Sequence, residues 1–480
     1  MSDIQNYIDS IEITDCSHHS QQENHFVNLI SSQKLAIVPS FVLESGDVLY
    51  EVPVAFKTWG KLNAEGTNCL LICHALSGSA DAADWWGPLM GPGRAFDPQR
   101  FFIVCLNSLG SPYGSASPVT WNPETQTTYG PEFPLTTVRD DVQIHKLVLQ
   151  RLGVKHIAMA VGGSMGGMLV LEWAFDKDFV GTIVPIATSL RHSAWCISWC
   201  EAQRQSIYSD PHFKDGYYEP DEQPVCGLGA ARMAALLTYR TKGSFERRFS
   251  RAAADTTRHP YPDHIPTPLS NNDARWVVHN EGNINRSERP ARSSGVSTPT
   301  SDMSSSFSQP PSLLSRRQSN DVLRRPMNTY FSAQSYLRYQ ANKFVKRFDA
   351  NCYISITRKL DTHDVMRDRA DTLEQAMQAI TQPALVMGIE TDGLFTFDEQ
   401  VEIVRLLKNG TLKSITSAEG HDGFLLEFDQ VNSYILEFQK EHLQQFLSSP
   451  LVDEKNTEGG ESLTTTRESV FGEMEDMASW

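Results

Sequence analysis

The sequence lacks the features that mark several broad classes of protein. It has no run of about 18 apolar residues, so we expect no membrane span. Basic side chains are outnumbered, with 42 Lys and Arg against 58 Asp and Glu, and the formal net charge is −16. This balance argues against nucleic acid as the main partner. Membrane and nucleic-acid functions are therefore disfavoured before any motif is considered.

Cysteine is scarce, and the spacing of the eight cysteines does not match a disulfide framework. Cys69, Cys73 and Cys105 fall in apolar runs, where buried free thiols are the usual state. Cys196 and Cys200 lie one helical turn apart, but no nearby His or Cys pair completes a zinc set, so we expect no metal. The N-terminus also lacks a basic segment followed by an apolar one, as a signal peptide would have. These observations favour a reducing, cytoplasmic location.

Short apolar runs alternate with helical patterns along much of the chain, which is long enough, at 480 residues and 40% hydrophobic, for a sizeable core. The runs have the length and composition of buried parallel strands. This alternation predicts an α/β fold, a mostly parallel sheet with helices on both faces. The predicted strands cover Val48 to Lys57, Asn68 to Cys73, Phe101 to Leu106, His156 to Val161, Ile183 to Ala187, Ala384 to Gly388 and Leu412 to Thr416.

The alternation stops after residue 190, where helical patterns follow one another without strands. Helices inserted into an α/β sheet favour a lid over an active site. Inside this region a stretch rich in Ser, Pro, Arg and Asn cannot bury enough apolar surface to fold, and we expect it to be disordered. The predicted segments are a polar N-terminal arm (1–36), a first core part (37–190), a lid (191–380) with a disordered insert (about 256–325), a second core part (381–447) and a disordered acidic tail (448–480).

A Gly-x-Ser-x-Gly pattern, Gly162-Gly163-Ser164-Met165-Gly166, lies between a predicted strand and a predicted helix. In a nucleophile elbow the serine is held in a strained turn, and glycines two residues away avoid collisions with neighbouring elements. The turn would place the hydroxyl at a helix N-terminus, whose dipole favours developing negative charge. The pattern therefore predicts Ser164 as a catalytic nucleophile.

A nucleophilic serine needs a histidine base and a carboxylate that orients the base. In α/β-hydrolase folds the acid and then the histidine follow late strands, in the chain order Ser, Asp or Glu, His. Here Asp392 follows the strand that starts at Ala384, and His421 follows the strand that starts at Leu412. Glu390 is the rival acid, but it lies closer to the strand end. We predict a triad of Ser164, Asp392 and His421.

The oxyanion hole should use the backbone N–H of Met165, the residue after the nucleophile, and one N–H from a loop after an early strand. The loop Cys73 to Gly78 has that position, and Leu76 is the candidate. His74 could instead be read as a base, but it precedes the nucleophile in the chain. We favour a packed histidine that shapes the loop.

Several motifs go beyond a generic hydrolase and resemble the homoserine O-acetyltransferase family, especially its fungal members. They include Cys73-His74-Ala75-Leu76-Ser77-Gly78-Ser79, Trp85-Trp86, Gly91-Pro92-Gly93-Arg94-Ala95-Phe96-Asp97, Gly162 to Met168, Glu172-Trp173-Ala174, Ala231-Arg232-Met233, Leu237-Thr238-Tyr239-Arg240 and Gly420-His421-Asp422-Gly423-Phe424. The resemblance implies an α/β-hydrolase fold with a helical lid. It also implies transfer of acetyl from acetyl-CoA, a co-substrate rather than a bound cofactor, to the hydroxyl of L-homoserine in methionine biosynthesis.

By the same resemblance, Arg232 and Asp422 contact the amino-acid substrate, and Tyr239 belongs to the substrate-binding set. A guanidinium suits a carboxylate and an acidic group suits an ammonium, so the chemistry is compatible. Family members often form dimers through the lid, which makes a homodimer an expectation by analogy. Serine as acceptor or succinyl-CoA as donor remain as alternatives, because one methylene in the acceptor changes binding by only a few kcal/mol. A simple esterase is a further alternative, and the intact triad speaks against a non-catalytic scaffold.

Overall fold

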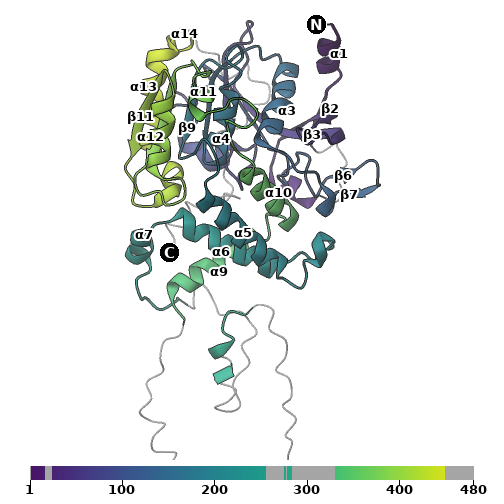
Figure 1. Ribbon diagram of the computed structural model, residues 1–480, viewed down its shortest axis with the longest axis vertical. Coiled ribbons are helices and arrows are strands. Elements are labelled where there is room, and N and C mark those ends of the chain that lie inside the picture. The colour runs from purple at the N-terminus through teal and green to yellow at the C-terminus, as the bar shows by residue number, and fades with distance from the viewer. Residues whose placement is uncertain (1, 17–23, 256–274, 277, 284–329, 449–480) are drawn as a thin grey trace, which may run out of the picture. The chain divides into compact units, whose positions relative to one another are not determined.

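The central feature is a large twisted sheet. The computed structural model describes residues 2–16, 24–255, 275–276, 278–283 and 330–448, and in these residues nine strands form one sheet of order β1-β2-β3-β5-β4-β8-β9-β10-β11 (Figure 1). The strands from β5 to β11 in this order pair in parallel, whereas β1, β2 and β3 add an antiparallel edge. The α/β fold with a mostly parallel sheet is therefore confirmed.

The antiparallel edge differs from the expected polar arm over 1–36. This segment forms the helix α1 (Ser2–Asp9), the strand β1 (Glu12–Asp15) and the start of β2 (Lys34–Val42). The strand β1 pairs with β2, and β2 pairs in turn with β3 (Val48–Trp59). Only Ile13 in β1 is a large apolar residue, so its sequence shows no apolar run, and pairing with β2 decides its conformation.

The inner parallel strands are almost wholly buried, as their apolar composition predicts, whereas the edge strand β11 buries only Ile415 fully. The parallel strands are β4 (Cys69–Cys73), β5 (Phe102–Leu106), β8 (Ile157–Gly163), β9 (Ile183–Ile186), β10 (Ala384–Ile389) and β11 (Gly410–Ile415). Cys69, Cys73 and Cys105 are buried free thiols, in agreement with expectation. The carboxyl ends of β8, β10 and β11 lead into the segments that carry Ser164, Asp392 and His421.

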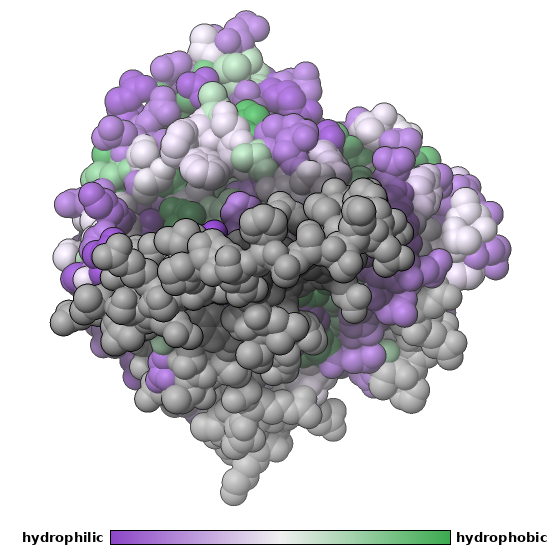
Figure 2. Space-filling model, turned by 90° about the horizontal axis from the view of Figure 1, so that it is seen from below, coloured by the Kyte–Doolittle hydropathy of each residue, from purple (hydrophilic) through white to green (hydrophobic). Residues whose placement is uncertain are grey.

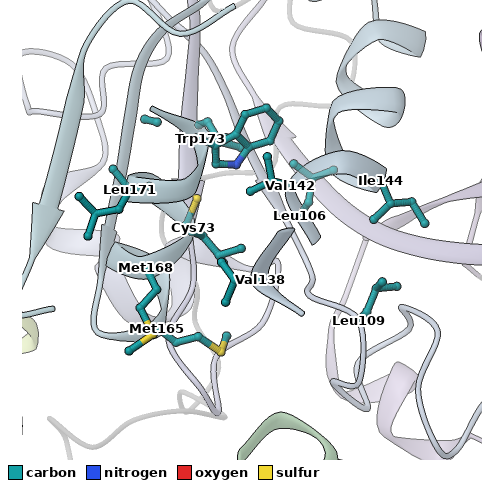
Figure 3. Close-up of a cluster of buried hydrophobic side chains, with 14 of the residues drawn as sticks. Cys73, Leu106, Leu109, Val138, Val142, Ile144, Met165, Met168, Leu171 and Trp173 are labelled. Carbon is teal, nitrogen blue, oxygen red and sulfur yellow. The ribbon is translucent and has the colours of Figure 1, made fainter. Parts of the chain in front are cut away.

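Two hydrophobic clusters cover the two faces of the sheet. Leu71 and Cys73 of β4 point into one cluster, and Leu70 and Ile72 point into the other, because successive side chains alternate along a strand. Helices α3 (Val138–Arg151) and α4 (Met165–Trp173) pack in the first cluster, where Val138, Val142, Met168 and Trp173 lie close together (Figure 3). Helix α13 (Phe428–His442) supplies Val431, Ile435 and Phe438 to the second.

Helices without intervening strands follow β9, as predicted for a lid. These are α5 (Ala194–Tyr208), α6 (Val225–Tyr239) and α7 (Lys242–Arg248), which lie below the sheet in Figure 1. Helices α9 (Ser332–Phe344), α10 (Ala350–Asp361) and α11 (Leu373–Met377) then lead back to β10. The remaining short elements are η1 (His25–Leu29), α2 (Ala82–Trp86), η2 (Gly87–Leu89), β6 (Trp121–Asn122), β7 (Thr127–Thr128), η3 (Gly130–Glu132), η4 (Lys214–Gly216), α12 (Phe397–Leu406), η6 (Gly420–Leu425) and α14 (Gln444–Leu447).

The described residues 249–255, 275–276, 278–283 and 330–336 belong to a unit separate from the rest of the chain. Within this unit, Ala253 pairs with Phe331 in an isolated bridge, and the Arg251 guanidinium lies 5.2 Å from the centre of the Phe331 ring. Most of the expected insert over 256–325 and all but the first residue of the expected tail over 448–480 lie outside the described residues.

The coloured surface in Figure 2 is mostly hydrophilic, with apolar residues scattered among polar ones. No helix in the described part of the chain is both long and apolar enough to cross a bilayer.

Candidate active site

Ser164 occupies a strained turn between β8 and α4. Its backbone has φ 59° and ψ −123°, a conformation that residues with a side chain rarely adopt. Backbone hydrogen bonds hold the turn: the Ser164 N–H donates to the Ile186 carbonyl at 2.9 Å, and the Thr188 hydroxyl donates to the Ser164 carbonyl at 2.9 Å. The strain is thus fixed by β9 and the residues that follow it, and the local geometry is that of a nucleophile elbow.

The glycines around Ser164 are required by close approach of other chain segments. A Cβ atom at Gly166 would lie 2.1 Å from the Cys73 carbonyl oxygen, which is backbone and cannot give way. A Cβ at Gly162 would lie 2.5 Å from the Gly166 carbonyl oxygen. The pattern read in the sequence therefore has a steric basis: it lets β4 and α4 approach each other at the turn.

His421 and Asp392 come together from the two loops in which they were predicted. The Nδ1 atom of His421 lies 2.7 Å from Oδ2 of Asp392, and both side chains are almost fully buried. The other carboxylate oxygen, Oδ1, accepts the backbone N–H groups of Leu394 and Phe395 at 2.8 and 3.0 Å. Three donors therefore fix the carboxylate, and the carboxylate in turn orients the imidazole.

Glu390, the rival acid, has a different environment. Its side chain is exposed, and its Oε1 accepts the Ser414 hydroxyl at 3.3 Å. Asp392, and not Glu390, thus accepts the hydrogen bond from His421.

One pocket collects most of the predicted site residues. Its lining includes Ser164, His421, Leu76, Arg232, Tyr239 and Asp422. Asp392 lies behind His421, and Met165 is the buried first residue of α4, so its N–H is at the helix N-terminus beside Ser164. The nucleophile, the base and the oxyanion candidate Leu76 therefore face the same space as the residues that the resemblance assigns to substrate.

Arg232 is a buried cation on α6. Its side chain is 2% exposed, and its guanidinium lies 4.9 Å from the centre of the Phe344 ring and 5.7 Å from that of Tyr239. The Tyr239 ring also lies 5.9 Å from the His421 ring, centre to centre. Aromatic faces of this kind hold a guanidinium in one orientation.

Asp422 is tied to the lid by an ion pair. Its Oδ2 lies 2.7 Å from Nε of Arg240, the residue directly after α6. Arg240 also donates to Glu419 at 3.1 Å. An ammonium group at Asp422 would therefore share this carboxylate with Arg240.

Residues 68–428 match the protein-family model described as alpha/beta hydrolase fold. The homoserine O-acetyltransferase of Schizosaccharomyces pombe is 69% identical, over 99% of this chain and 99% of that protein. The homoserine O-acetyltransferase of Saccharomyces cerevisiae is 50% identical, over 96% of each chain. This chain belongs to the homoserine O-acetyltransferase family.

Solved structures agree at the level of the fold. A homoserine O-acetyltransferase from Bacillus anthracis superposes with a TM-score of 0.66 and 20% identity, over 88% of this chain and 98% of that one. The esterase E22 superposes with a TM-score of 0.64 and 22% identity, over 87% and 99%. Transferases and esterases therefore share this architecture, and the reaction has to be argued from the residues of the site.

The structure adds pocket residues to which the sequence analysis gave no role. Arg347 is buried, lines the pocket and donates through Nη1 to the Ser77 carbonyl at 3.2 Å and the Tyr113 hydroxyl at 3.0 Å. Arg240 lay inside a quoted family motif, but only the ion pair with Asp422 reveals what it contacts. No local pattern distinguishes Arg347 from a surface arginine, because its partners are more than 200 residues away in sequence.

Two cysteines, Cys196 and Cys200, also line the pocket, and neither is suited to be the nucleophile. Burial raises the pKa of the Cys196 thiol to about 11 and that of Cys200 to about 12, so both remain protonated near neutral pH. His192, Cys200 and Asp361 have ligand atoms within 4.8 Å of one another, which is close enough to consider a metal. However, the Arg204 guanidinium already lies 2.7 Å from Asp361, so we interpret the group as an ion-pair network.

Glu399, in the first turn of α12, carries a perturbed carboxyl group beside the triad. Burial raises its pKa from the ordinary 4.5 to about 7; a backbone hydrogen bond with Thr396 opposes the shift, and the negative charge of Asp392 adds to it. The folded protein thus keeps a proton on Glu399 that the unfolded chain loses at lower pH.

We expect Glu399→Gln to change how stability depends on pH. Between about pH 4.5 and 7 the folded state binds more protons at this position, so wild-type stability falls as pH rises through that window. The side chain is partly exposed, and solvent screens the effect. The free energy of unfolding of the variant should therefore exceed that of wild type by only about 1 kcal/mol at pH 8, and the two should be equal at pH 4. Urea unfolding at both pH values measures this, and an equal difference at the two would contradict it.

Proposed function

We propose that this chain transfers an acetyl group from acetyl-CoA to the hydroxyl of L-homoserine through an acetyl-serine intermediate. The observation that carries the proposal is one pocket lined by Ser164 on its elbow, His421 held by Asp392, and the buried Arg232. The 69% identity to a homoserine O-acetyltransferase supports the same reaction.

In the first half-reaction, Nε2 of His421 takes the Ser164 hydroxyl proton while Oγ attacks the thioester carbonyl. The N–H groups of Met165 and Leu76 hold the resulting oxyanion. The carbon–sulfur bond then breaks, and the proton on His421 goes to the departing coenzyme A thiolate. Acetyl-CoA is a co-substrate here, and the proposed chemistry uses only protein groups.

In the second half-reaction, His421 takes the proton of the homoserine hydroxyl, which attacks the acetyl-serine. Collapse of the second oxyanion breaks the bond to Ser164 Oγ, which recovers its proton from His421. Arg232 binds the homoserine carboxylate, Asp422 receives the ammonium and Tyr239 completes the wall of the substrate site. The buried free thiols at Cys69, Cys73 and Cys105 support a reducing, cytoplasmic setting for the reaction.

Thiol release from acetyl-CoA with a panel of acceptors tests this function. We expect sustained release with L-homoserine and a single burst, at most one thiol per active site, without acceptor. Faster release with L-serine than with L-homoserine would reassign the acceptor. Sustained release without acceptor would indicate a hydrolase, and a preference for succinyl-CoA would reassign the donor.

Arg232→Lys should weaken the homoserine half-reaction selectively. Lysine keeps the charge but loses the two parallel N–H groups that fit a carboxylate, so kcat/KM for homoserine should fall about 10- to 100-fold. Acylation by acetyl-CoA alone should change little. Arg247→Lys on the exposed side of α7 is the matched control. Equal losses in both half-reactions would instead place Arg232 in coenzyme A binding or in the packing of the lid.

A further inference from the structure

The loop that supplies Leu76 is a tight hydrogen-bonded turn directly after β4. Its first carbonyl, that of Ala75, accepts the Gly78 N–H at 2.9 Å. Ala75, Leu76, Ser77 and Gly78 all line the pocket that contains Ser164. The orientation of each peptide group in this turn therefore decides whether its N–H or its C=O faces the nucleophile.

His74 precedes this turn and is fully buried. The backbone N–H of Ser108 donates to Nε2 of His74 at 2.9 Å, so Nε2 carries a lone pair and the ring proton is on Nδ1. Nδ1 lies 2.8 Å from the Ala75 carbonyl oxygen, to which it donates that proton. Burial lowers the pKa of His74 to about 4, which keeps the ring neutral at physiological pH.

Both ring nitrogens are thus engaged by the backbone, which excludes His74 as the base for Ser164 and agrees with the packed role favoured from the sequence. The loop that contains Ser108 and Leu109 is itself firmly held. The Leu109 N–H donates to Asp141 at 2.8 Å, and the fully buried Lys359 ammonium lies 2.5 Å from the same carboxylate. The imidazole is therefore a rigid spacer between a fixed loop and the Ala75 carbonyl.

The Ala75 carbonyl and the Leu76 N–H belong to one planar trans peptide group, so they point in opposite directions. A donor that captures the carbonyl on one side aims the N–H to the other side. We propose that His74 is a positioning residue for acetyl transfer: by binding the Ala75 carbonyl it turns the Leu76 N–H toward the oxyanion that forms at Ser164. This inference rests on the proposed function, in which Leu76 is an oxyanion donor.

Two substitutions separate the two hydrogen bonds of His74. The amide of glutamine reaches the position of Nε2, so His74→Gln can still accept from Ser108 but cannot donate to Ala75. The amide nitrogen of asparagine reaches the position of Nδ1, so His74→Asn can still donate to Ala75. Both variants remove the ring, and a role in packing alone would affect them alike.

We expect His74→Gln to lower kcat of the acylation step about 100-fold, the scale of losing one oxyanion donor, with KM for acetyl-CoA changed less than about threefold. His74→Asn should recover at least tenfold of that loss. Pre-steady-state thiol release measures both constants, and thermal unfolding checks that the variants fold. Equal kcat values for two folded variants, or a loss confined to KM, would overturn the inference.

If the glutamine variant does not fold, the asparagine variant alone decides. A folded His74→Asn with kcat within about tenfold of wild type supports the inference, and a larger loss overturns it. Failure of the proposed function is recognised separately, in wild-type protein alone, by the donor and acceptor outcomes given above or by the absence of thiol release from acetyl-CoA. The same pair of variants would in that case be compared in hydrolysis of p-nitrophenyl acetate, with the same two outcomes.

Discussion

Ser164→Ala is expected to abolish thiol release from acetyl-CoA even without acceptor, because no acyl-enzyme can form. Loss of a triad member typically lowers the rate by a factor on the order of 10⁴ to 10⁶. The fold should survive, since the bonds that hold the turn use the backbone of residue 164 and not its hydroxyl. Circular dichroism and thermal unfolding of the variant should therefore match wild type.

Mass spectrometry of wild-type protein after exposure to acetyl-CoA gives the positive counterpart of this result. Acetyl should appear on the peptide that contains Ser164 and should be lost on addition of L-homoserine. Ser198→Ala is a matched control, because that hydroxyl is exposed on α5 and donates only to its own helix, at the Ala194 carbonyl. Acetyl on a different residue, or thiol release that survives in Ser164→Ala, would overturn the assignment of the nucleophile.

The sequence predicted the parts of the molecule whose cause is local. The Gly-x-Ser-x-Gly turn, the apolar runs of β4 and β8 and the loops after β10 and β11 each carry their signal within a few residues. Chain order then linked Ser164, Asp392 and His421, because parallel strands place their carboxyl ends at one edge of the sheet. The His421–Asp392 hydrogen bond is the geometry that this reasoning anticipates.

The features that the sequence did not predict depend on contacts between distant segments. The strand β1 has the sequence Glu-Ile-Thr-Asp and forms an edge because β2 offers it a partner. The guanidinium of Arg347 reaches the pocket from beyond the insert, and Asp422 meets Arg240 at the end of a lid helix. Arg347 has no local pattern that separates it from a solvated charge. Arg240 and Asp422 lie in quoted motifs, but only the tertiary structure shows that they contact each other.

We also expect a large effect from Asp392→Asn, because the two carboxylate oxygens of Asp392 accept hydrogen bonds from different donors. Oδ1 accepts two backbone N–H groups, from Leu394 and Phe395, and Oδ2 accepts from Nδ1 of His421. In Asp392→Asn the two N–H donors select the amide oxygen for the first position. The amide NH₂ must then face His421 and donate to Nδ1.

A histidine that accepts at Nδ1 carries its proton on Nε2, and it cannot take the proton of Ser164. We therefore expect Asp392→Asn to keep the fold and to lower kcat of acylation about 10⁴-fold, the scale observed when a triad histidine is held in the wrong tautomer. Glu390→Gln, which removes the charge of the exposed rival acid two residues away, should stay within about twofold of wild type. Stopped-flow thiol release measures both. If Glu390→Gln lost the larger factor, the orienting acid would be Glu390, and the hydrogen bond from His421 to Asp392 would serve packing rather than catalysis.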